Sequence, residues 1–393
     1  MNSIIFHEFK KNATNKLLIG IVFMLLFANA FNIYQSNDKF HDKFNIDSTE
    51  AQWCIYERLE GEITEEKINW LNSYIATLEP IVNGESEELP GYYFNAYGDL
   101  TFSVNFLDTI EKTQDYSNRI DNLIKTNNEQ LNIYRQKNNE YLIKTAEYVS
   151  DTYSSREISS FYNVEAYDTY FDYNFSSFLI LLIIFLFTAS LYAGENEIGM
   201  TSLMRSTPRG RIELSNAKQT AMVLFIAVIS ALFLICDFLM FLWCLRLRGI
   251  QCPLYAIKSF EYTPLVISIG EFIVLNAMLK IVGFICFALI SCVFSSILKK
   301  SYLVFSTDLI MCLCLMLLSV YSGGVLDYIN LFNPINMLLN RDLFANFNVV
   351  NIFGTPIFKY IISYACIAFF VCILSAIVNL INNTNSTAKR CKR

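Results

Sequence analysis

The chain has 393 residues, of which 54% are hydrophobic and 17% are charged, and its formal net charge is −6. Its mean hydropathy of +0.36 excludes an ordinary soluble domain and indicates a protein that crosses a membrane several times. Because the basic residues gather at the ends of apolar runs, where membrane topology explains them, nucleic-acid binding is excluded as well.

Six apolar runs are long enough to cross a bilayer, which takes about 20 residues in a helix. They cover residues 16–34, 174–194, 217–245, 272–298, 301–321 and 358–381. No small-residue cleavage site follows the first run, so we expect a retained anchor instead of a cleaved signal peptide. The predicted fold is an all-α polytopic membrane protein with three parts: residues 1–34, a large helical extracellular domain at 35–173, and a five-span membrane domain at 174–393.

Residues 35–173 differ sharply in charge from the rest of the chain. They hold 26 acidic and 11 basic residues, a balance of −15, whereas the remainder holds 10 acidic and 19 basic residues, a balance of +9. Apolar residues recur at helical spacing in residues 68–78 and, with gaps, in 110–148. This pattern predicts a helical hairpin or small bundle standing on the membrane, divided at 84–98. Arg246 and Arg248, at the outer end of the third run, would pair with this acidic segment or reach lipid headgroups.

Charge also predicts the orientation. Thirteen basic residues against four acidic ones flank the spans on one side, at the N-terminus, in 194–218, at 299–300 and at the C-terminus. The positive-inside rule then puts both termini in the cytoplasm of a cell membrane, as in a bacterial plasma membrane.

The most informative segment is GENEIGMTSLMRSTPRGRIELSNAK, residues 194–218, between the second and third spans. An acidic pair precedes a short amphipathic stretch, a Ser-Thr-Pro break, and basic residues that lead into the next span. This order resembles the first cytoplasmic loop of permeases of the second class of ATP-binding-cassette (ABC) exporters, with Met200 where Thr is usual. The matching residues are Glu195, Glu197, Gly199, Leu203, Ser206, Thr207, Pro208, Arg211 and Lys218.

The resemblance implies a permease that works with a separate cytoplasmic ABC ATPase and a second permease subunit. It implies that the loop forms a coupling helix that docks on the ATPase, and an ordinary basic loop with simple helix capping is the alternative. It also implies short re-entrant helices within 322–356, where NPINMLL starts at Asn333; a plain outer loop is the alternative there. The candidate coupling residues are Glu195, Glu197, Gly199, Leu203, Arg205, Pro208 and Arg211.

Four charged residues lie within apolar runs, where an ionisable group faces a cavity or a partner by default. Asp237 is the deepest and would line a path or join helices. Glu271 and Lys280 would be interfacial, near an outer half-helix at 265–276, or would face a cavity. Asp308 lies two turns from Lys300, so solvation at the inner surface is the alternative to burial.

The sequence holds no catalytic motif, metal site or cofactor site that we recognise. None of the 14 glycines precedes a lysine, so a P-loop is absent, and H-E-x-x-H and G-x-S-x-G are absent as well. ATP hydrolysis is therefore expected on a partner. Eight of the 11 cysteines lie in apolar runs as small hydrophobic residues, and a Cys54–Cys252 bridge stays open. The alternative function is a receptor or immunity protein whose acidic outer domain captures cationic peptides.

Overall fold

The computed structural model describes residues 2–41, 46–85, 93, 95–154, 156–199, 212–298, 300–321 and 325–387. Six of its helices contain stretches that are long and apolar enough to cross a membrane, which confirms the predicted number of spans. They are α2 (Lys16–His41), α9 (Phe175–Ala189), α12 (Ile212–Leu245), α13 (Ile269–Ile297), α14 (Ser301–Val320) and α18 (Lys359–Thr387).

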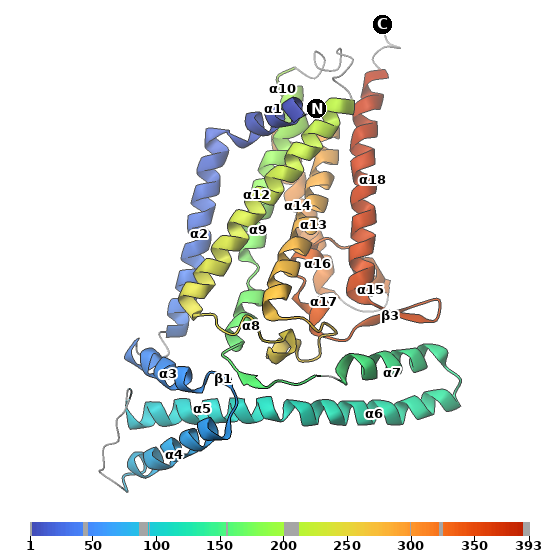
Figure 1. Ribbon diagram of the computed structural model, residues 1–393. Helices are drawn as coiled ribbons and strands as arrows, with labels where there is room; N and C mark the ends of the chain where they lie inside the picture. Colours follow the sequence, from blue (N-terminus) through green and yellow to red (C-terminus); the bar gives the residue numbers. More distant parts are fainter. Residues whose placement is uncertain are drawn as a thin grey trace.

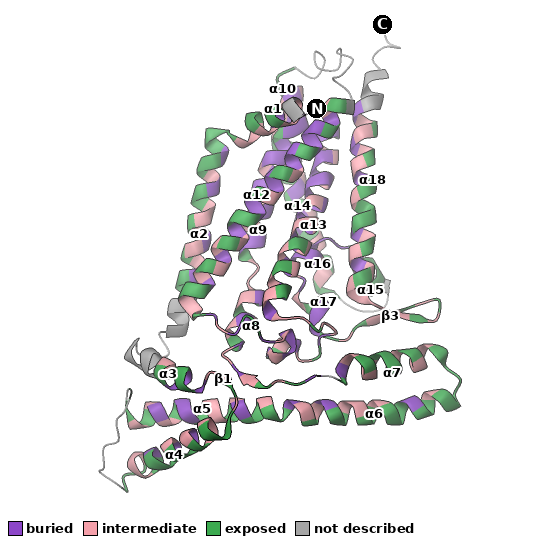
Figure 2. Ribbon diagram, in the orientation of Figure 1, coloured by how far each residue is buried: buried purple, intermediate pink, exposed green. Residues whose placement is uncertain are grey.

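The six helices form one bundle with two different ends (Figure 1). The end that holds α1 (Asn2–Ala13) and the last turns of α18 is called the terminal end here. The opposite end, which carries the segment between α2 and α9, is called the domain end. Figure 2 shows buried residues concentrated on α9 and on the inward sides of α12 and α13, with exposed residues along the outward faces. The helix α9 is thus the centre of the bundle, and the exposed apolar faces suit a lipid environment.

The start of α13 corrects one expectation. A capping box starts the helix at Ile269: the Ser268 side chain accepts from the backbone of Glu271, and the Glu271 carboxylate accepts in return from the backbone of Ser268. The preceding residues pair with the segment after α12, where Leu254 N–H donates to Ile267 O at 2.9 Å. The outer half-helix expected at 265–276 is therefore wrong, and one continuous helix of 29 residues takes its place.

The segment at the domain end is mainly helical, as its periodicity predicted. It contains α3 (Ile46–Leu59), α4 (Glu65–Val82), α5 (Ala96–Gln114), α6 (Tyr116–Gln136), α7 (Glu140–Tyr153) and α8 (Glu165–Asp172). Leu71, Ile75 and Leu78 of the predicted stripe are buried on α4. The sequence predicted a helical hairpin or small bundle standing on the membrane, whereas α5, α6 and α7 lie across the end of the helix bundle (Figure 1).

The described residues are mainly helical, as predicted, and they also contain two small antiparallel sheets that the sequence analysis did not predict. Strand β1 (Gly61–Glu62) pairs with β2 (Ser160–Phe161), and β3 (Val349–Ile352) pairs with β4 (Thr355–Phe358). The disulfide considered between Cys54 and Cys252 is not formed, because both thiols are free and Cys54 is exposed while Cys252 is buried.

Ion pairs attach the segment 46–172 to the bundle. Arg248, just beyond α12, donates to Glu57 at 2.9 Å and to Glu60 at 2.8 Å, so of the two alternatives predicted for it, pairing with the acidic segment is the one observed. Arg119 on α6 pairs with Glu261 at 3.0 Å, in the loop that holds the 3₁₀ turns η2 (Leu254–Ala256) and η3 (Lys258–Phe260). These contacts hold the segment against the domain end.

Short helices precede the last span, as the sequence resemblance implies: α15 (Val325–Asn330), α16 (Ile335–Leu338) and α17 (Arg341–Ala345). A Cβ at Gly283, midway along α13, would lie 2.9 Å from Met337 and 3.0 Å from Leu338, so α16 packs directly on the backbone there. Asn333 Nδ2 donates to the Leu315 carbonyl of α14 at 2.8 Å. Contacts with α13 and α14 therefore shield the backbone around α16.

Candidate functional site

The backbone changes its winding at the terminal end of α9. A π-helix, η1 (Ser190–Gly194), follows Ala189 directly and leads into the short helix α10 (Glu195–Glu197). Ser295 of α13 stabilises this turn: its Oγ accepts from the Tyr192 and Ala193 amides at 3.3 and 3.0 Å and donates to the Ala189 carbonyl at 3.2 Å. π-Helices are rare, and they occur frequently at functional sites.

Glu195 joins three separate elements through one carboxylate. Its Oε1 accepts from Lys11 of α1 at 2.9 Å, and its Oε2 accepts from Lys218 of α12. Lys218 also donates to the Leu191 carbonyl at 3.0 Å, and its ammonium lies 4.8 Å from the Tyr192 ring centroid. Glu195 and Lys218 are buried, at 6% and 2% exposure. A buried charge is tolerated only when it is paired and hydrogen-bonded, so this network fixes α10 against α1 and α12.

Lys11 lies outside the spans, and its side chain is 37% exposed. Partial burial would lower the pKa of its ammonium, but the hydrogen bond and charge of Glu195, together with the charge of Glu8, raise that pKa above its ordinary value of 10.5. Lys11 is therefore a cation at neutral pH, and α1 stays attached to α10.

Glu197 has a different role from Glu195, although the sequence grouped the two. Its Oε1 accepts from the backbone amide of Ser301 at 2.6 Å and so caps the start of α14. The side chains of Glu197 and Ile198 are exposed, Ile198 by 75%. Gly199 follows with φ +76°, a left-handed conformation that glycine adopts without strain. Glu195 therefore faces the protein interior, whereas Glu197 and Ile198 form a surface beside the start of the 200–211 segment.

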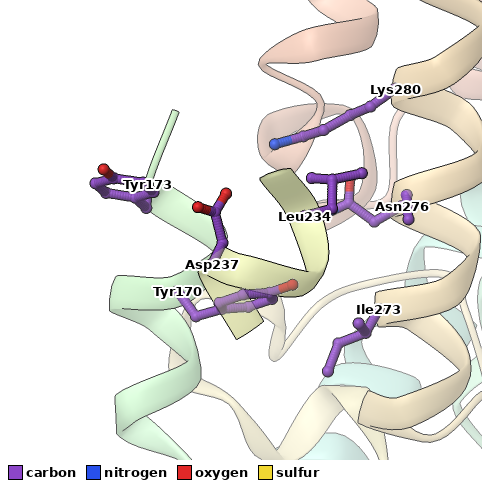
Figure 3. Close-up of a pocket in the computed structure, with 8 residues that line it drawn as sticks. Tyr170, Tyr173, Leu234, Asp237, Ile273, Asn276 and Lys280 are labelled. Carbon is purple, nitrogen blue, oxygen red and sulfur yellow. The ribbon is translucent and has the colours of Figure 1, made fainter. Parts of the chain in front are cut away.

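A second cluster of polar side chains lies inside the domain-end half of the bundle (Figure 3). Asp237 of α12 accepts from Asn29 Nδ2 of α2 at 2.5 Å, and Asn29 Oδ1 accepts from the Tyr173 hydroxyl at 2.8 Å. The Lys280 side chain of α13 extends toward Asp237 and donates to Asn174 at 3.4 Å. The cavity between them measures about 20 Å³, room for one water molecule. The group thus connects α2, α12 and α13 at the end of α8.

The other two intramembrane candidates lie in different surroundings. Asp308 is completely buried and accepts from Ser291 Oγ at 2.5 Å, and Ser291 bonds Thr188 of α9 at 2.6 Å. Of the two alternatives for Asp308, burial against a partner is confirmed and solvation at the inner surface is wrong, because its side chain is buried and accepts from Ser291 of α13. Glu271 is exposed and belongs to the capping box of α13, so it does not join the buried groups.

The family model for ABC-2 family transporter proteins matches residues 2–387. The chain belongs to this family. A search of curated proteins gives no match to the sequence. Family membership agrees with the resemblance found in residues 194–218, and it makes the chain a multi-pass membrane protein of the permease type, in a transporter complex that includes an ATPase.

Only part of the permease's predicted coupling segment falls within the structure. Glu195, Glu197 and Gly199 are described, and Leu203, Arg205, Pro208 and Arg211 lie outside the described residues. In the sequence, Lys11 served only to predict topology and Lys218 only as a motif match and a topology residue, so their pairing with Glu195 was not predicted. Ser295 was not predicted as a site residue. Asn29 carried a detectable signal, because it is one of two amide side chains, with Asn32, within the first apolar run. Within the described parts of the chain, no three His, Cys, Asp or Glu residues are placed to hold a metal ion.

Proposed function

We propose that the permease is half of an ATP-driven exporter and transmits the nucleotide cycle of a separate ATPase through α10 and η1 into α9. The observation that carries this proposal is the Glu195 network. Because one buried carboxylate holds α10 to both α1 and α12, a push on the adjacent surface of Glu197 and Ile198 moves three elements together. Rigid movement of packed helices is a common way to switch access between two sides.

In this proposal the terminal end is cytoplasmic and the domain end is extracellular. The support is the excess of basic residues around the terminal end. Two copies of this permease, or two related permeases, form the translocation path from the terminal end to the domain end. ATP is hydrolysed on the separate ATPase because this sequence has no P-loop. An amphiphile or peptide is the substrate class that fits such an exporter. Family membership favours transport over the receptor or immunity alternative.

The test uses the permease co-expressed with its ATPase. Glu197→Arg is expected to fold and insert normally but to lose most ATPase recruitment and stimulation, because it reverses the charge of the exposed surface. Glu197→Gln keeps an oxygen that can cap α14 and removes only the charge. If capping alone matters, Glu197→Gln behaves as the parent; if docking needs the charge, it falls between parent and Glu197→Arg.

Glu129→Arg is the matched control, since it makes the same charge change at an exposed site on α6, at the domain end. It is expected to leave the ATPase interaction unchanged. Normal assembly and parental stimulation by the Glu197→Arg protein would refute the coupling role of this surface.

A further inference from the structure

The hairpin of β3 and β4 has a tight and well-fixed turn. Ile352 pairs with Thr355, and the two residues between them, Phe353 and Gly354, have φ of +49° and +80°. The Asn351 side chain accepts from the Gly354 amide at 2.9 Å, and the Thr355 hydroxyl donates to the Ile352 carbonyl at 2.6 Å. These bonds hold the tip in one conformation, the two-residue turn with both φ positive.

Phe353 is an unusual residue for this position. Asn, Asp and Gly are preferred where φ is positive in such turns, and a bulky side chain there is an outlier. The ring is also fully exposed, at 104% of its reference area. A turn surrounded by water gains nothing from such a residue, since it loses backbone preference and exposes an apolar ring. Something outside this chain therefore compensates at the tip.

The location of the hairpin indicates what contacts the Phe353 ring. Strand β4 ends at Phe358, and α18, the last candidate span, begins at the next residue, Lys359. The base is fixed by ring contacts of Phe358 with Tyr148 of α7 at 6.0 Å and with Tyr360 at 5.4 Å. Figure 1 shows the hairpin projecting sideways past the start of α18. Its tip is thus held beside the bundle at the level where a span begins.

The composition of the hairpin matches this level. Residues 346–358 contain no Asp, Glu, Lys or Arg. An apolar Phe ring suits the boundary between headgroups and acyl chains, where the Trp, Phe and Leu side chains of membrane-surface segments are buried. A second protein is a poorer partner for the tip, because a stable protein interface buries about 800 Å² on each side, far more than one ring offers.

We infer that Phe353 inserts into the headgroup boundary of the lipid leaflet at the domain end, and that the hairpin anchors the start of α18 to that leaflet. The inference needs only that the chain spans a membrane, so it stands or falls separately from the export proposal.

Photocrosslinking tests the contact directly. Phe353 is replaced by p-benzoylphenylalanine in the full-length protein, which is reconstituted in vesicles of phosphatidylcholine and phosphatidylglycerol and illuminated. Tyr97 on α5, an aromatic side chain that is 72% exposed within the segment attached to the domain end, receives the same replacement as the control. We expect a lipid adduct at 353 and none at 97. No adduct at 353, or a crosslink to a second chain in its place, would overturn the inference.

A second variant, Phe353→Asn, changes the hydrogen exchange of the hairpin in opposite directions depending on whether Phe353 lies in lipid or in water. Asn suits a positive φ, so in water Phe353→Asn would tighten the turn and slow hydrogen exchange of the β3 and β4 amides. If the ring is anchored in lipid, the same change removes the anchor, and we expect several-fold faster exchange of these amides in vesicles. Slower or unchanged exchange would contradict insertion. This measurement requires only folded protein, and the favourable backbone preference of Asn protects folding.

Discussion

Lys218 is the residue whose removal best tests the energetic role of the network at the terminal end. Its side chain is 2% exposed, and its ammonium has two oxygen acceptors, Glu195 Oε2 and the Leu191 carbonyl. Lys218→Met keeps most of the side-chain volume and removes the charge. Glu195 would then keep its ion pair with Lys11 through its other oxygen.

The expected loss follows from burial. Removing one partner of a buried ion pair costs about 3–5 kcal/mol, since the other charge is left uncompensated. Lys11 still neutralises Glu195 in part, so we expect a loss near the lower limit, about 3 kcal/mol. Lys11→Met should cost no more than about 1 kcal/mol, because that side chain is 37% exposed. The double variant Glu195→Leu with Lys218→Met should lose less than Lys218→Met alone, since it leaves no unpaired buried charge.

The free energies come from denaturant unfolding of the purified permease in detergent micelles, with all four proteins measured under one set of conditions. The order of stability is the critical result. A loss for Lys218→Met no larger than that for Lys11→Met would show that the buried contact carries no special energy, and the rigid connection between α10 and α12 would have to be abandoned.

Three further predictions concern other contacts. Ser295→Ala should cost about 2 kcal/mol and speed hydrogen exchange in residues 190–194, because two buried amides lose their acceptor. Ser296→Ala is the control: its hydroxyl donates within its own helix, to the Cys292 carbonyl, and accepts from Asn382, so its loss should cost less and leave that exchange unchanged. Gly283→Val should cost about 1–3 kcal/mol by forcing α16 away from α13, whereas Gly20→Ala, with no neighbour within 4 Å, should be neutral or stabilising in the same unfolding assay. The raised pKa of Lys11 means that its contribution to stability is fully present below pH 10.5 and is lost as pH rises through its folded-state pKa. The difference in unfolding free energy between parent and Lys11→Met should therefore be constant from pH 7 to about pH 10 and vanish at higher pH. A free-energy difference that disappears nearer neutrality would contradict this assignment.

The spans were predictable because a bilayer imposes both length and composition on a helix. The stripe on α4 was predictable for the same kind of reason, since burial of one helical face repeats along the sequence. The start of α13 was missed although its signal was present: Ser268 and Glu271 have the spacing of a capping box. The apolar run that continues across this point obscured it.

Contacts between distant segments were beyond local reasoning. The π-helix depends on Ser295, about 100 residues away in the sequence, and residues 190–194 by themselves contain no pattern that predicts a π-helix. For Asp308, the distance from Lys300 along the sequence left burial and solvation both open, because the rotation of the helix decides which neighbour a side chain meets. Glu195 and Glu197 are two residues apart and therefore point in different directions, so one pairs inside the protein and the other reaches its surface.

The attachment of α6 to the bundle has a mechanical consequence. Arg119 holds the first turn of α6 to Glu261, and α7 is held to the same loop where Tyr153 donates to the Tyr262 carbonyl at 2.6 Å. From Arg119 to the far end of α6 at Gln136 the helix extends about 25 Å, so a rotation of the loop by about 5° displaces that end by about 2 Å. A spectroscopic label at Asn138 would thus report, in magnified form, small rotations between α12 and α13 that are too slight to measure within the bundle itself.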